Sequence, residues 1–567
     1  MIELDKMTLY HVLESSSKNF ADYPSLSFVD GVPLTYRDLY AKVKEISHIL
    51  SQQGIVKGDR VAILSENKPN WGIAYLAITT MGAIAVPILP DFHANAVHHI
   101  IRHSESKAIF VSESLYSKVE DVDANKLETV FLLEDFQLVP KQTKKDMLEE
   151  VVKEGLKEFN RLRDAAMHLG KKNAFIAQIE EDDLAEIIYT SGTTGHSKGV
   201  MLTHKNIVFT GLATIAIVNA TKTDRLLSIL PLSHTYECTL GFITPFIAGS
   251  SIYYIKKPPT PRLLTEAMMK VKPTIMCSVP LVIEKIFKMR ILPKFTHQFV
   301  MRNMYKISTV RKKLHQMAGK KLMESFGGEL RAFAIGGASL TPEVEKFLRE
   351  ANFPYCIGYG LTETSPLIAG TRPEDTKYRS TGPPLKDVQM KIDKPHPITG
   401  EGEILVKSPN VMKGYYKDKE RTAEVLSKDG WFRTGDLGVF DDDGYLYIKG
   451  RSKNVILGPS GENIYPEEIE AVINETEYVL ESLVFEQNKQ LVARVHLNYD
   501  WLDKELDCMK QSESKSEQCV KDLLENLRKH VNEHLSSFSK LARIIEQTEP
   551  FEKTPTQKIK RYLYIES

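Results

Sequence analysis

The chain has 567 residues, of which 42% are hydrophobic, 26% charged and 9% aromatic. This length is about three times that of a typical domain, so we expect several packed units, and the apolar content excludes a disordered chain. The 74 basic and 74 acidic residues cancel, so the overall charge does not indicate binding to nucleic acid or to an anionic membrane. Small-molecule chemistry is therefore the favoured class of function.

The N-terminal residues and the cysteines predict a cytoplasmic protein. Residues 1–20 contain no basic segment followed by an apolar stretch, so we expect no secretory signal. Gly, Pro or polar residues interrupt the apolar windows 71–90 and 239–255, which we interpret as buried helix and strand rather than membrane spans. The five cysteines form no CxxC pair and have no His partner at metal-ligand spacing, which indicates reduced thiols.

Residues 34–112 alternate between a helix pattern and short apolar runs. The amphipathic residues 34–50 predict a helix, and residues 60–65, 83–90 and 108–112 predict buried strands. This alternation is typical of an α/β fold. Residues 141–172, rich in Lys and Glu, predict a solvated helix that connects two halves of a large domain.

Residues 189–200, YTSGTTGHSKGV, follow an apolar strand pattern and precede a helix pattern that starts at Lys205. Three glycines let the backbone approach an anion, the Ser and Thr hydroxyls donate hydrogen bonds, and Lys198 adds a positive charge. The GxxxxGK[ST] spacing of a P-loop is absent. We predict a polyphosphate-binding loop with ligands Thr190, Ser191, Gly192, Thr193, Thr194, Gly195 and Lys198.

The second half of the chain begins with a basic helical stretch at 285–325. It is either an ordinary amphipathic insertion or a surface that meets a membrane or an anionic partner. After Gly400, short strand patterns joined at Gly and Asp turns predict antiparallel strands. A helix opened by Pro and acidic residues is predicted at 464–474. We place a domain boundary at Lys453, between residues 1–452 and a small C-terminal domain of residues 453–567.

Several further motifs follow the phosphate loop in order along the chain. They are LPLSHTYE at 230–237, IGGASLTPEV at 335–344, GYGLTETSP at 358–366, GWFRTGDLG at 430–438, GRSKNVI at 450–456 and PTQKIKR at 555–561. With the loop at 189–200, they make essentially the whole chain resemble the adenylate-forming superfamily of acyl-CoA synthetases, adenylation domains and luciferases. Many members of the superfamily have glycine at the position of Gln557, and the form found here is similar to the long-chain fatty acyl-CoA synthetases. The 285–325 stretch and the run DGWFRTGDLG resemble the same subgroup.

The resemblance implies an α/β fold with a large N-terminal domain and a small, mobile C-terminal α+β domain. The large domain would consist of two α/β subdomains and a small β-barrel-like subdomain. The implied co-substrates and cofactor are ATP, coenzyme A and Mg²⁺.

The resemblance also assigns roles to individual residues. Lys558 would bridge the carboxylate and the α-phosphate, and Glu363 would hold the magnesium, with Thr362 and His234 close to the reacting phosphate. The adenine and ribose would be held by Gly337, Ala338, Tyr359, Gly360, Asp436 and Arg451. Lys453 would be the hinge of the C-terminal domain, and Gly461 and Glu462 would lie on the side of coenzyme A.

We therefore expect an enzyme that activates a long-chain fatty acid with ATP, releases pyrophosphate, and transfers the acyl group to coenzyme A. An acyl-ACP synthetase or a fatty acyl-AMP ligase, which delivers the acyl group to a carrier protein, is the alternative. The expected partners are fatty acid, ATP and coenzyme A, without nucleic acid. Contact with a membrane surface or a carrier protein, and the oligomeric state, stay open.

Overall fold

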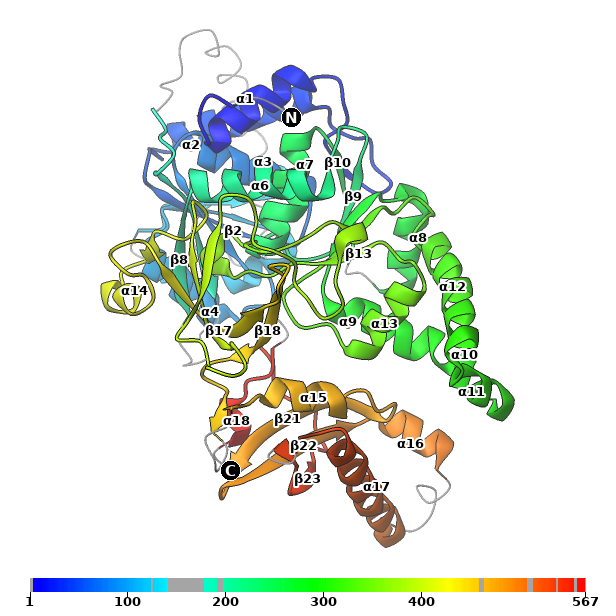
Figure 1. Ribbon diagram of the computed structural model, residues 1–567. Helices are drawn as coiled ribbons and strands as arrows, with labels where there is room; N and C mark the ends of the chain where they lie inside the picture. The colour runs from blue at the N-terminus through cyan, green and yellow to red at the C-terminus, as the bar shows by residue number, and fades with distance from the viewer. Residues whose placement is uncertain are drawn as a thin grey trace.

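The structure is a computed structural model that describes residues 4–123, 126–140, 178–190, 197–257, 260–296, 298–457, 463–506, 513–536, 539–554 and 558–565 (Figure 1). The helix expected at 141–172 lies outside these residues. Seven predicted site residues also lie outside them, namely Ser191, Gly192, Thr193, Thr194, Gly195, Gly461 and Glu462.

An eight-stranded sheet forms the first part of the fold, in the order β16-β8-β7-β3-β2-β4-β5-β6. Its strands are β2 (Arg60–Leu64), β3 (Ile84–Ile88), β4 (Ala108–Val111), β5 (Thr129–Leu132), β6 (Leu138–Val139), β7 (Leu184–Thr190), β8 (Lys198–Thr203) and β16 (Gly414–Tyr415). The predicted strands at 60–65, 83–90 and 108–112 are confirmed as the parallel neighbours β2, β3 and β4. The helix predicted at 34–50 is α2 (Tyr36–Gln52), which begins with a capping box between Thr35 and Asp38.

The connection between the phosphate loop and the next helix differs from the expectation. We expected residues 189–200 to form a loop, but Lys198–Thr203 form β8, which pairs antiparallel with β7, with Thr190 opposite Lys198. The helix expected from Lys205 is confirmed as α6 (His204–Val218), which starts directly after β8. The reason is that Val200 and Leu202 are buried on one face of the sheet, so Lys198 belongs to a strand rather than to the loop.

A six-stranded sheet forms the second part, in the order β1-β10-β9-β11-β12-β13. Its strands are β1 (Leu26–Phe28), β9 (Arg225–Ser228), β10 (Ser251–Tyr254), β11 (Ile275–Ser278), β12 (Ala332–Ile335) and β13 (Tyr355–Ile357). All of its pairings are parallel. The carboxyl ends of its strands therefore lie at a single edge, where ligands of open parallel sheets bind.

The helices between the two sheets contain the most apolar windows of the sequence. Helix α3 (Pro69–Thr80) has 11 of its 12 residues buried, and it packs with α1 (Leu9–Asn19) and α2. The second window forms the π-helix η3 (Tyr236–Ile243), α7 (Thr244–Ala248) and β10, which are also buried. Across the described ranges, no helix combines the length and the apolar character that a membrane crossing requires.

The helices around the second sheet include the predicted basic stretch. They are α8 (Pro261–Val271), α9 (Pro280–Ile286), the π-helix η4 (Phe287–Ile291), α10 (Pro293–Thr296), α11 (Phe299–Tyr305), α12 (Ser308–Ser325) and α13 (Pro342–Glu350). The expectation that residues 285–325 are helical is confirmed for the residues described there.

A four-stranded antiparallel sheet follows, with the order β14-β15-β17-β18. Its strands are β14 (Gln389–Asp393), β15 (Gly402–Lys407), β17 (Phe432–Phe440) and β18 (Leu446–Arg451). In this sheet β14 and β18 are edge strands that do not pair with each other, so the described strands do not close into the expected barrel. Four strands are fewer than a closed barrel needs. The α/β class of the whole fold is confirmed.

The C-terminal segment has its own small sheet and its own apolar core. Its elements are β19 (Ile456–Leu457), β20 (Asn463–Ile464), α15 (Pro466–Ile473), β21 (Val479–Gln487), β22 (Gln490–Leu497), α16 (Tyr499–Glu505), α17 (Glu513–Glu533), β23 (Arg543–Glu546) and α18 (Tyr562–Ile565). The buried core residues run from Ile464 to Leu541, apart from the cores of the two large sheets. Figure 1 shows this segment below the rest of the molecule. The boundary at Lys453 stays a prediction.

The cysteines agree with the expectation only in part. Cys238, Cys277 and Cys356 are free and buried. Cys519, in α17, is disulfide-bonded, so the expectation of reduced thiols is wrong at this position. Pairing depends on how close two Cα atoms come in space, and sequence spacing does not report this distance.

The buried carboxylate of Asp224 joins the amino ends of three strands of the six-stranded sheet. It accepts hydrogen bonds from Arg331 Nε (2.9 Å) and Nη2 (2.6 Å), from Thr274 Oγ1 (2.7 Å) and from the backbone N–H of Thr221 (2.7 Å). Asp224, Thr274 and Arg331 directly precede β9, β11 and β12. Burial alone would raise the pKa of Asp224, but these hydrogen bonds and the charge of Arg331 hold it below its ordinary value.

We predict that Asp224→Asn lowers the free energy of unfolding by about 2 kcal/mol, because it removes the charge of a buried carboxylate that Arg331, 38% exposed, and Thr274 bond. Glu329→Gln is the matched control, since Glu329 pairs with Arg225 on the exposed surface beside it, and it should cost less than about 1 kcal/mol. Urea unfolding at neutral pH measures both changes. The lowered pKa means that the contribution of Asp224 is present above its unfolded pKa and disappears as the pH falls through the folded value. Equal costs for the two variants would contradict this role.

Candidate active site

The predicted nucleotide and catalytic residues of the second sheet lie at one edge. His234 follows β9, Gly337 and Ala338 follow β12, and Tyr359 and Glu363 follow β13. Because these strands are parallel neighbours or lie in the same parallel sheet, the loops after them meet at their carboxyl ends. The structure therefore brings together residues that are up to 129 positions apart in the sequence.

Two glycines at this edge occupy positions where a side chain would cause backbone strain or a clash. Gly337 has a φ of 86°, in the left-handed region that favours glycine. At Gly360, an added Cβ would lie 1.5 Å from the carbonyl oxygen of Pro366. Both positions therefore require glycine, and the backbone at Gly337 and Ala338 stays exposed at the edge.

Asp436 holds a buried carboxylate between an aromatic residue and a cation. It lies on β17 opposite Arg451 of β18, and Arg451 Nε is 2.7 Å from Asp436 Oδ1. The Tyr359 hydroxyl donates to Asp436 Oδ2 at 2.7 Å. Burial raises the pKa of Asp436, and the charge of Arg451 opposes this shift. A carboxylate has about four acceptor positions, so Asp436 keeps capacity for further donors.

Glu363 is connected to Lys198 through Tyr415, a residue that the sequence analysis did not identify. The Tyr415 hydroxyl donates to Glu363 Oε1 at 2.9 Å, and Lys198 Nζ lies 4.8 Å from the centre of the Tyr415 ring. Partial burial lowers the pKa of Lys198, while the charge of Glu363 opposes this effect. Tyr415 reaches this position because β16 pairs with β8, with Tyr415 opposite Val200. Nothing in the local run KGYY signals this long-range contact.

His234 is neutral at physiological pH and has one fixed acceptor nitrogen. Its Nδ1 accepts a hydrogen bond from the backbone N–H of Tyr236 at 3.2 Å. Burial, reinforced by the positive charge of Lys558, lowers the pKa of His234 to about 4. Because Nδ1 is an acceptor, the proton of the neutral ring lies on Nε2, which leaves a neutral N–H donor available.

Lys558 reaches the site from the far end of the chain. The charges of Arg451, Asp436 and Glu363 all act on it, and its own charge acts on His234. Surrounding protein and the repulsion of Arg451 lower the pKa of Lys558, although its side chain remains exposed to solvent. The charge of the predicted catalytic lysine therefore interacts with the predicted ribose residues Asp436 and Arg451, with Glu363 and with His234.

The backbone around Lys558 is attached to the C-terminal sheet by ion pairs. Arg561 Nη2 lies 2.8 Å from Glu470 Oε1 of α15, and Lys553 pairs with Glu481 of β21. The Lys558 carbonyl accepts from the N–H of Thr554 at 2.8 Å. These contacts join residues on both sides of Lys558 to α15 and β21.

The remaining predicted residues lie around this centre. Thr190 ends β7 opposite Lys198, and Thr362 begins the 3-10 helix η5 (Thr362–Thr364), which also contains Glu363. Lys453 is exposed in the turn after β18, and its charge reaches Lys198. A groove of about 1450 Å³ between α1, α6 and α7 contains none of the predicted site residues, so we place the chemistry at the sheet edge.

The cations, the buried carboxylate of Asp436 and the hydroxyl donors suit a nucleotide ligand, and they lie where the antiparallel strands β17 and β18 meet the loops of the second sheet. The sequence matches the family described as AMP-binding enzyme over residues 13–416, which is most of the chain. The protein belongs to this AMP-binding enzyme family.

Curated relatives are similar over nearly the full length. The long-chain-fatty-acid–CoA ligase 5 of Rattus norvegicus is 30% identical, and the alignment covers 98% of this chain and 86% of the relative. The fatty acyl-CoA synthetase A of Dictyostelium discoideum is 27% identical, with 98% and 88% covered.

Solved structures confirm the fold. An anthranilate CoA ligase in complex with anthranoyl-AMP has a TM-score of 0.76 at 20% identity, with 98% of this chain and 96% of that chain covered. The ATP-bound MatB of Rhodopseudomonas palustris has a TM-score of 0.74 at 24% identity, with 98% of each chain covered.

A buried acid, Glu237, lies three residues after His234 in the sequence. Glu237, in η3, accepts a hydrogen bond from Ser228 Oγ at 2.6 Å through Oε1, while its Oε2 has no hydrogen-bond partner among the described residues. Burial raises the pKa of Glu237 to about 8. Glu237 is therefore protonated at neutral pH, and its ionisation would place a charge in an apolar environment.

We predict that Glu237→Gln makes the protein less sensitive to alkaline pH. Because the folded pKa is raised, the contribution of Glu237 to stability is present below its unfolded pKa of 4.5 and is lost as the pH rises through about 8. Between pH 7 and pH 9, the variant should avoid a loss of about 1 kcal/mol that the wild type suffers. Unfolding at both pH values measures this difference, with the exposed Glu266→Gln as the control. An unchanged pH dependence in Glu237→Gln would show that the carboxyl group is not buried as described.

Proposed function

We propose that this protein is an acyl-CoA synthetase that activates a long-chain fatty acid as its adenylate and then transfers the acyl group to coenzyme A. The observation that carries the proposal is the position of Lys558. A cation from the last residues of the chain interacts electrostatically with Asp436, Arg451, Glu363 and His234. The names of the relatives, a long-chain ligase and a fatty acyl-CoA synthetase, support the same assignment.

The nucleotide would be held by the residues of the sheet edge. Asp436 would accept hydrogen bonds from the ribose hydroxyls, with Arg451 on its other side. Tyr359, next to the exposed backbone of Gly337 and Ala338, would contact the adenine. Thr190 and Lys198 would bind the phosphates together with the loop between them. This arrangement is supported by the hydrogen bonds that already orient Asp436.

The donor set fits a magnesium ion that is bound largely by substrate. Mg²⁺ typically takes one or two carboxylates, and its other ligands are phosphate oxygens and water. Glu363 is such a carboxylate, and Tyr415 orients it. The described residues contain no cluster of three or more His, Cys, Asp or Glu side chains that could hold a metal without substrate. When bound, the ion would reduce the negative charge of the triphosphate.

In the first half-reaction, a carboxylate oxygen of the fatty acid attacks the α-phosphorus of ATP, and the bond to pyrophosphate breaks. Lys558 would reduce the repulsion between the carboxylate and the phosphate, and Lys198 would stabilise the departing charge. The neutral His234 would donate its Nε2 proton in a hydrogen bond without adding a charge. The product is a mixed anhydride from which AMP can leave.

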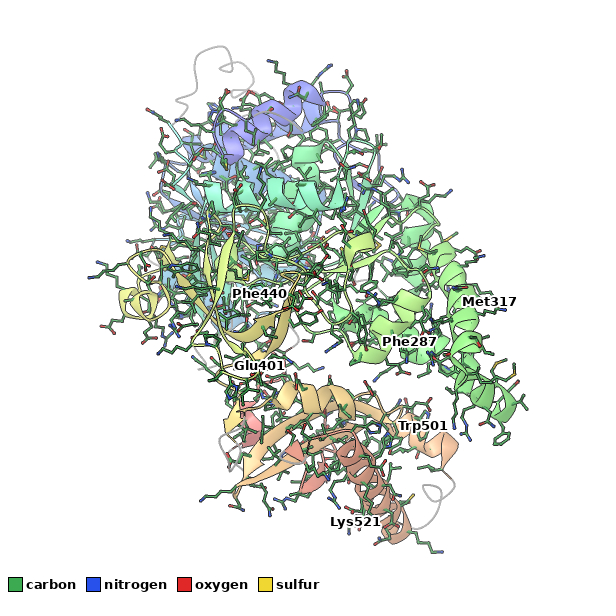
Figure 2. The ribbon with its side chains drawn as sticks, in the orientation of Figure 1. Phe287, Met317, Glu401, Phe440, Trp501 and Lys521 are labelled. Carbon is green, nitrogen blue, oxygen red and sulfur yellow. The ribbon has the colours of Figure 1, made fainter. Side chains whose placement is uncertain are left out.

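In the second half-reaction, the thiol of coenzyme A attacks the acyl carbonyl, and the bond to AMP breaks. Lys558 occupies the site in the present orientation, so we propose that the C-terminal segment rotates about Lys453 between the two half-reactions. Among the described residues, few polar contacts resist this motion. Tyr465 donates to Glu401 at 2.8 Å, Lys449 lies 3.8 Å from Glu468, and Lys288 bonds to the Asn474 carbonyl. Figure 2 labels Glu401 at the junction of the two parts.

The acyl chain would enter the apolar space behind Tyr236. The Tyr236 hydroxyl donates to the Ala334 carbonyl at 3.0 Å, and Ala334 lines a small cavity together with Thr214, Val218, Leu240 and Cys277. The cavity, about 20 Å³, holds about one water molecule, so a long chain would have to displace side chains. Ala220 lines both this cavity and the groove between α1, α6 and α7, which supports a path for a long chain towards that groove.

A chain-length series tests the proposed substrate. We expect pyrophosphate release to depend on added fatty acid and to be greatest with long saturated chains, because each buried methylene adds apolar contact. Coenzyme A and a holo-carrier protein are supplied in parallel reactions, and the thioester product is identified. Preference for short or aromatic acids would contradict the long-chain assignment, and transfer only to the carrier protein would contradict coenzyme A as the acceptor.

Lys558→Ala separates the two half-reactions. We predict that it lowers the rate of adenylate formation by at least ~10²-fold, the scale of losing one charge-stabilising donor, while preformed acyl-adenylate still reacts with coenzyme A. Lys560→Ala is the matched control, because Lys560 lies two residues away and pairs with Glu552 at 3.1 Å instead. Single-turnover assays of each half-reaction measure the effect. Equal loss of both half-reactions in Lys558→Ala would rule out the proposed role.

A further inference from the structure

We propose that the helical arm, defined as α10, α11 and α12 (residues 293–325), docks the protein on an anionic lipid membrane. Figure 1 shows the arm projecting from the second sheet, with α11 at its tip. The proposal depends on three features of the arm, which are its charge, its exposed apolar side chains and its attachment to the core. It does not depend on the proposed function.

The arm carries a concentration of positive charge that the rest of the chain does not balance locally. Residues 293–325 contain eight Lys or Arg and one acidic residue, Glu324, although the net charge of the whole chain is zero. The basic residues are Lys294, Arg302, Lys306, Arg311, Lys312, Lys313, Lys320 and Lys321. Arg311 pairs with Glu350 of α13 at 2.9 Å, and within the described part of the chain the other seven form no ion pair. Seven cations are thus available to an external anionic surface.

The tip of the arm exposes apolar side chains between these cations. The exposed fractions are 71% for Phe299, 68% for Val300, 42% for Met304 and 53% for Ile307, and α11 has no buried residue. Val300 and Met304 follow the i, i+4 spacing of one face of α11, and Ile307 lies in the connection that leads into α12. Met317 of α12 is 62% exposed as well (Figure 2). An apolar face at the end of a projection has no part of its own chain to cover it.

The base of the arm is firmly packed, which holds the exposed tip in a defined position. Phe295 stacks on Tyr305 with ring centres 5.4 Å apart, and the Tyr305 hydroxyl lies 2.8 Å from His315 Nε2. His315 Nδ1 and Arg311 both lie within 3 Å of the Glu350 carboxylate. These contacts fix the direction in which α11 points. The arm can therefore insert into a surface without first having to order itself.

The combination of features fits a lipid surface better than an acidic protein. An acidic protein would be bound by the cations alone, and an apolar protein contact normally lies in a pocket or a groove. Here the apolar side chains lie at the end of a projection and are flanked by long, flexible lysines. Such side chains insert at the boundary of headgroups and acyl chains, while lysines extend towards anionic headgroups.

Vesicle flotation of the full chain tests the proposal. We expect binding to phosphatidylcholine vesicles that contain about a quarter phosphatidylglycerol to be at least ~10-fold stronger than binding to pure phosphatidylcholine, and to weaken with added salt. The double variant Val300→Asp and Ile307→Asp should lose at least ~10-fold of this binding. The matched control is Val32→Asp and Ile398→Asp, which changes the same residue types at positions that are 92% and 90% exposed elsewhere. The control should bind like the wild type.

Three results would overturn the proposal. The wild type would not bind the anionic vesicles, or the arm variant would bind them as well as the wild type does, or the control variant would lose as much binding as the arm variant. A parallel binding assay with an acidic holo-carrier protein distinguishes the other class of partner. If the wild type binds this protein and not the vesicles, the arm is a protein-docking surface. Circular dichroism and pyrophosphate release with a freely soluble fatty acid confirm that the arm variant is folded.

Discussion

The buried carboxylate of Asp436 is the point where three parts of the fold meet. Tyr359 reaches it from the second sheet, Arg451 from the neighbouring strand β18, and the charge of Lys558 from the C-terminal segment. Burial disfavours an isolated carboxylate, so Asp436 depends on these partners. The same dependence explains why its surroundings contain both a donor hydroxyl and cations, which is also what a sugar–phosphate ligand needs. The groups that compensate for the burial of Asp436 are therefore the ones that we propose to hold the nucleotide.

The placement of Lys558 makes the site conditional on the orientation of the C-terminal segment. The lysine is attached to that segment through Arg561 and Lys553, while the polar contacts between the described residues of the segment and the large part of the molecule are few. An apolar interface would hold one orientation strongly, whereas a small polar interface can be exchanged at modest cost. The balance of contacts therefore suits an enzyme whose two half-reactions need different groups in one place.

The arm and the predicted active site lie on different parts of the second sheet and its helices. The carboxyl ends of its strands carry the reacting groups, and the helices that follow β11 project outward as the arm. Residues 285–325 left two interpretations open at the level of sequence, a plain insertion or an interaction surface. The exposed fractions of Phe299 and Val300, set against the burial of Phe295, favour the second interpretation because they show which face of the helices lacks a cover.

Local patterns in the sequence were sufficient for the α/β class, for the strands β2, β3 and β4, for helix α2, and for the motif residues that gather at the sheet edge. These features depend on hydrophobic periodicity and on short motifs, in which neighbouring residues act together. Tyr415 beside Glu363, the strand β8 after the phosphate loop, the open form of the four-stranded sheet and the bonded state of Cys519 were not predicted. Each of them depends on which distant segments become neighbours. The raised pKa of Glu237 and the lowered pKa of His234 were decided in the same way, because desolvation is set by the packing around a group and not by its neighbours in the chain.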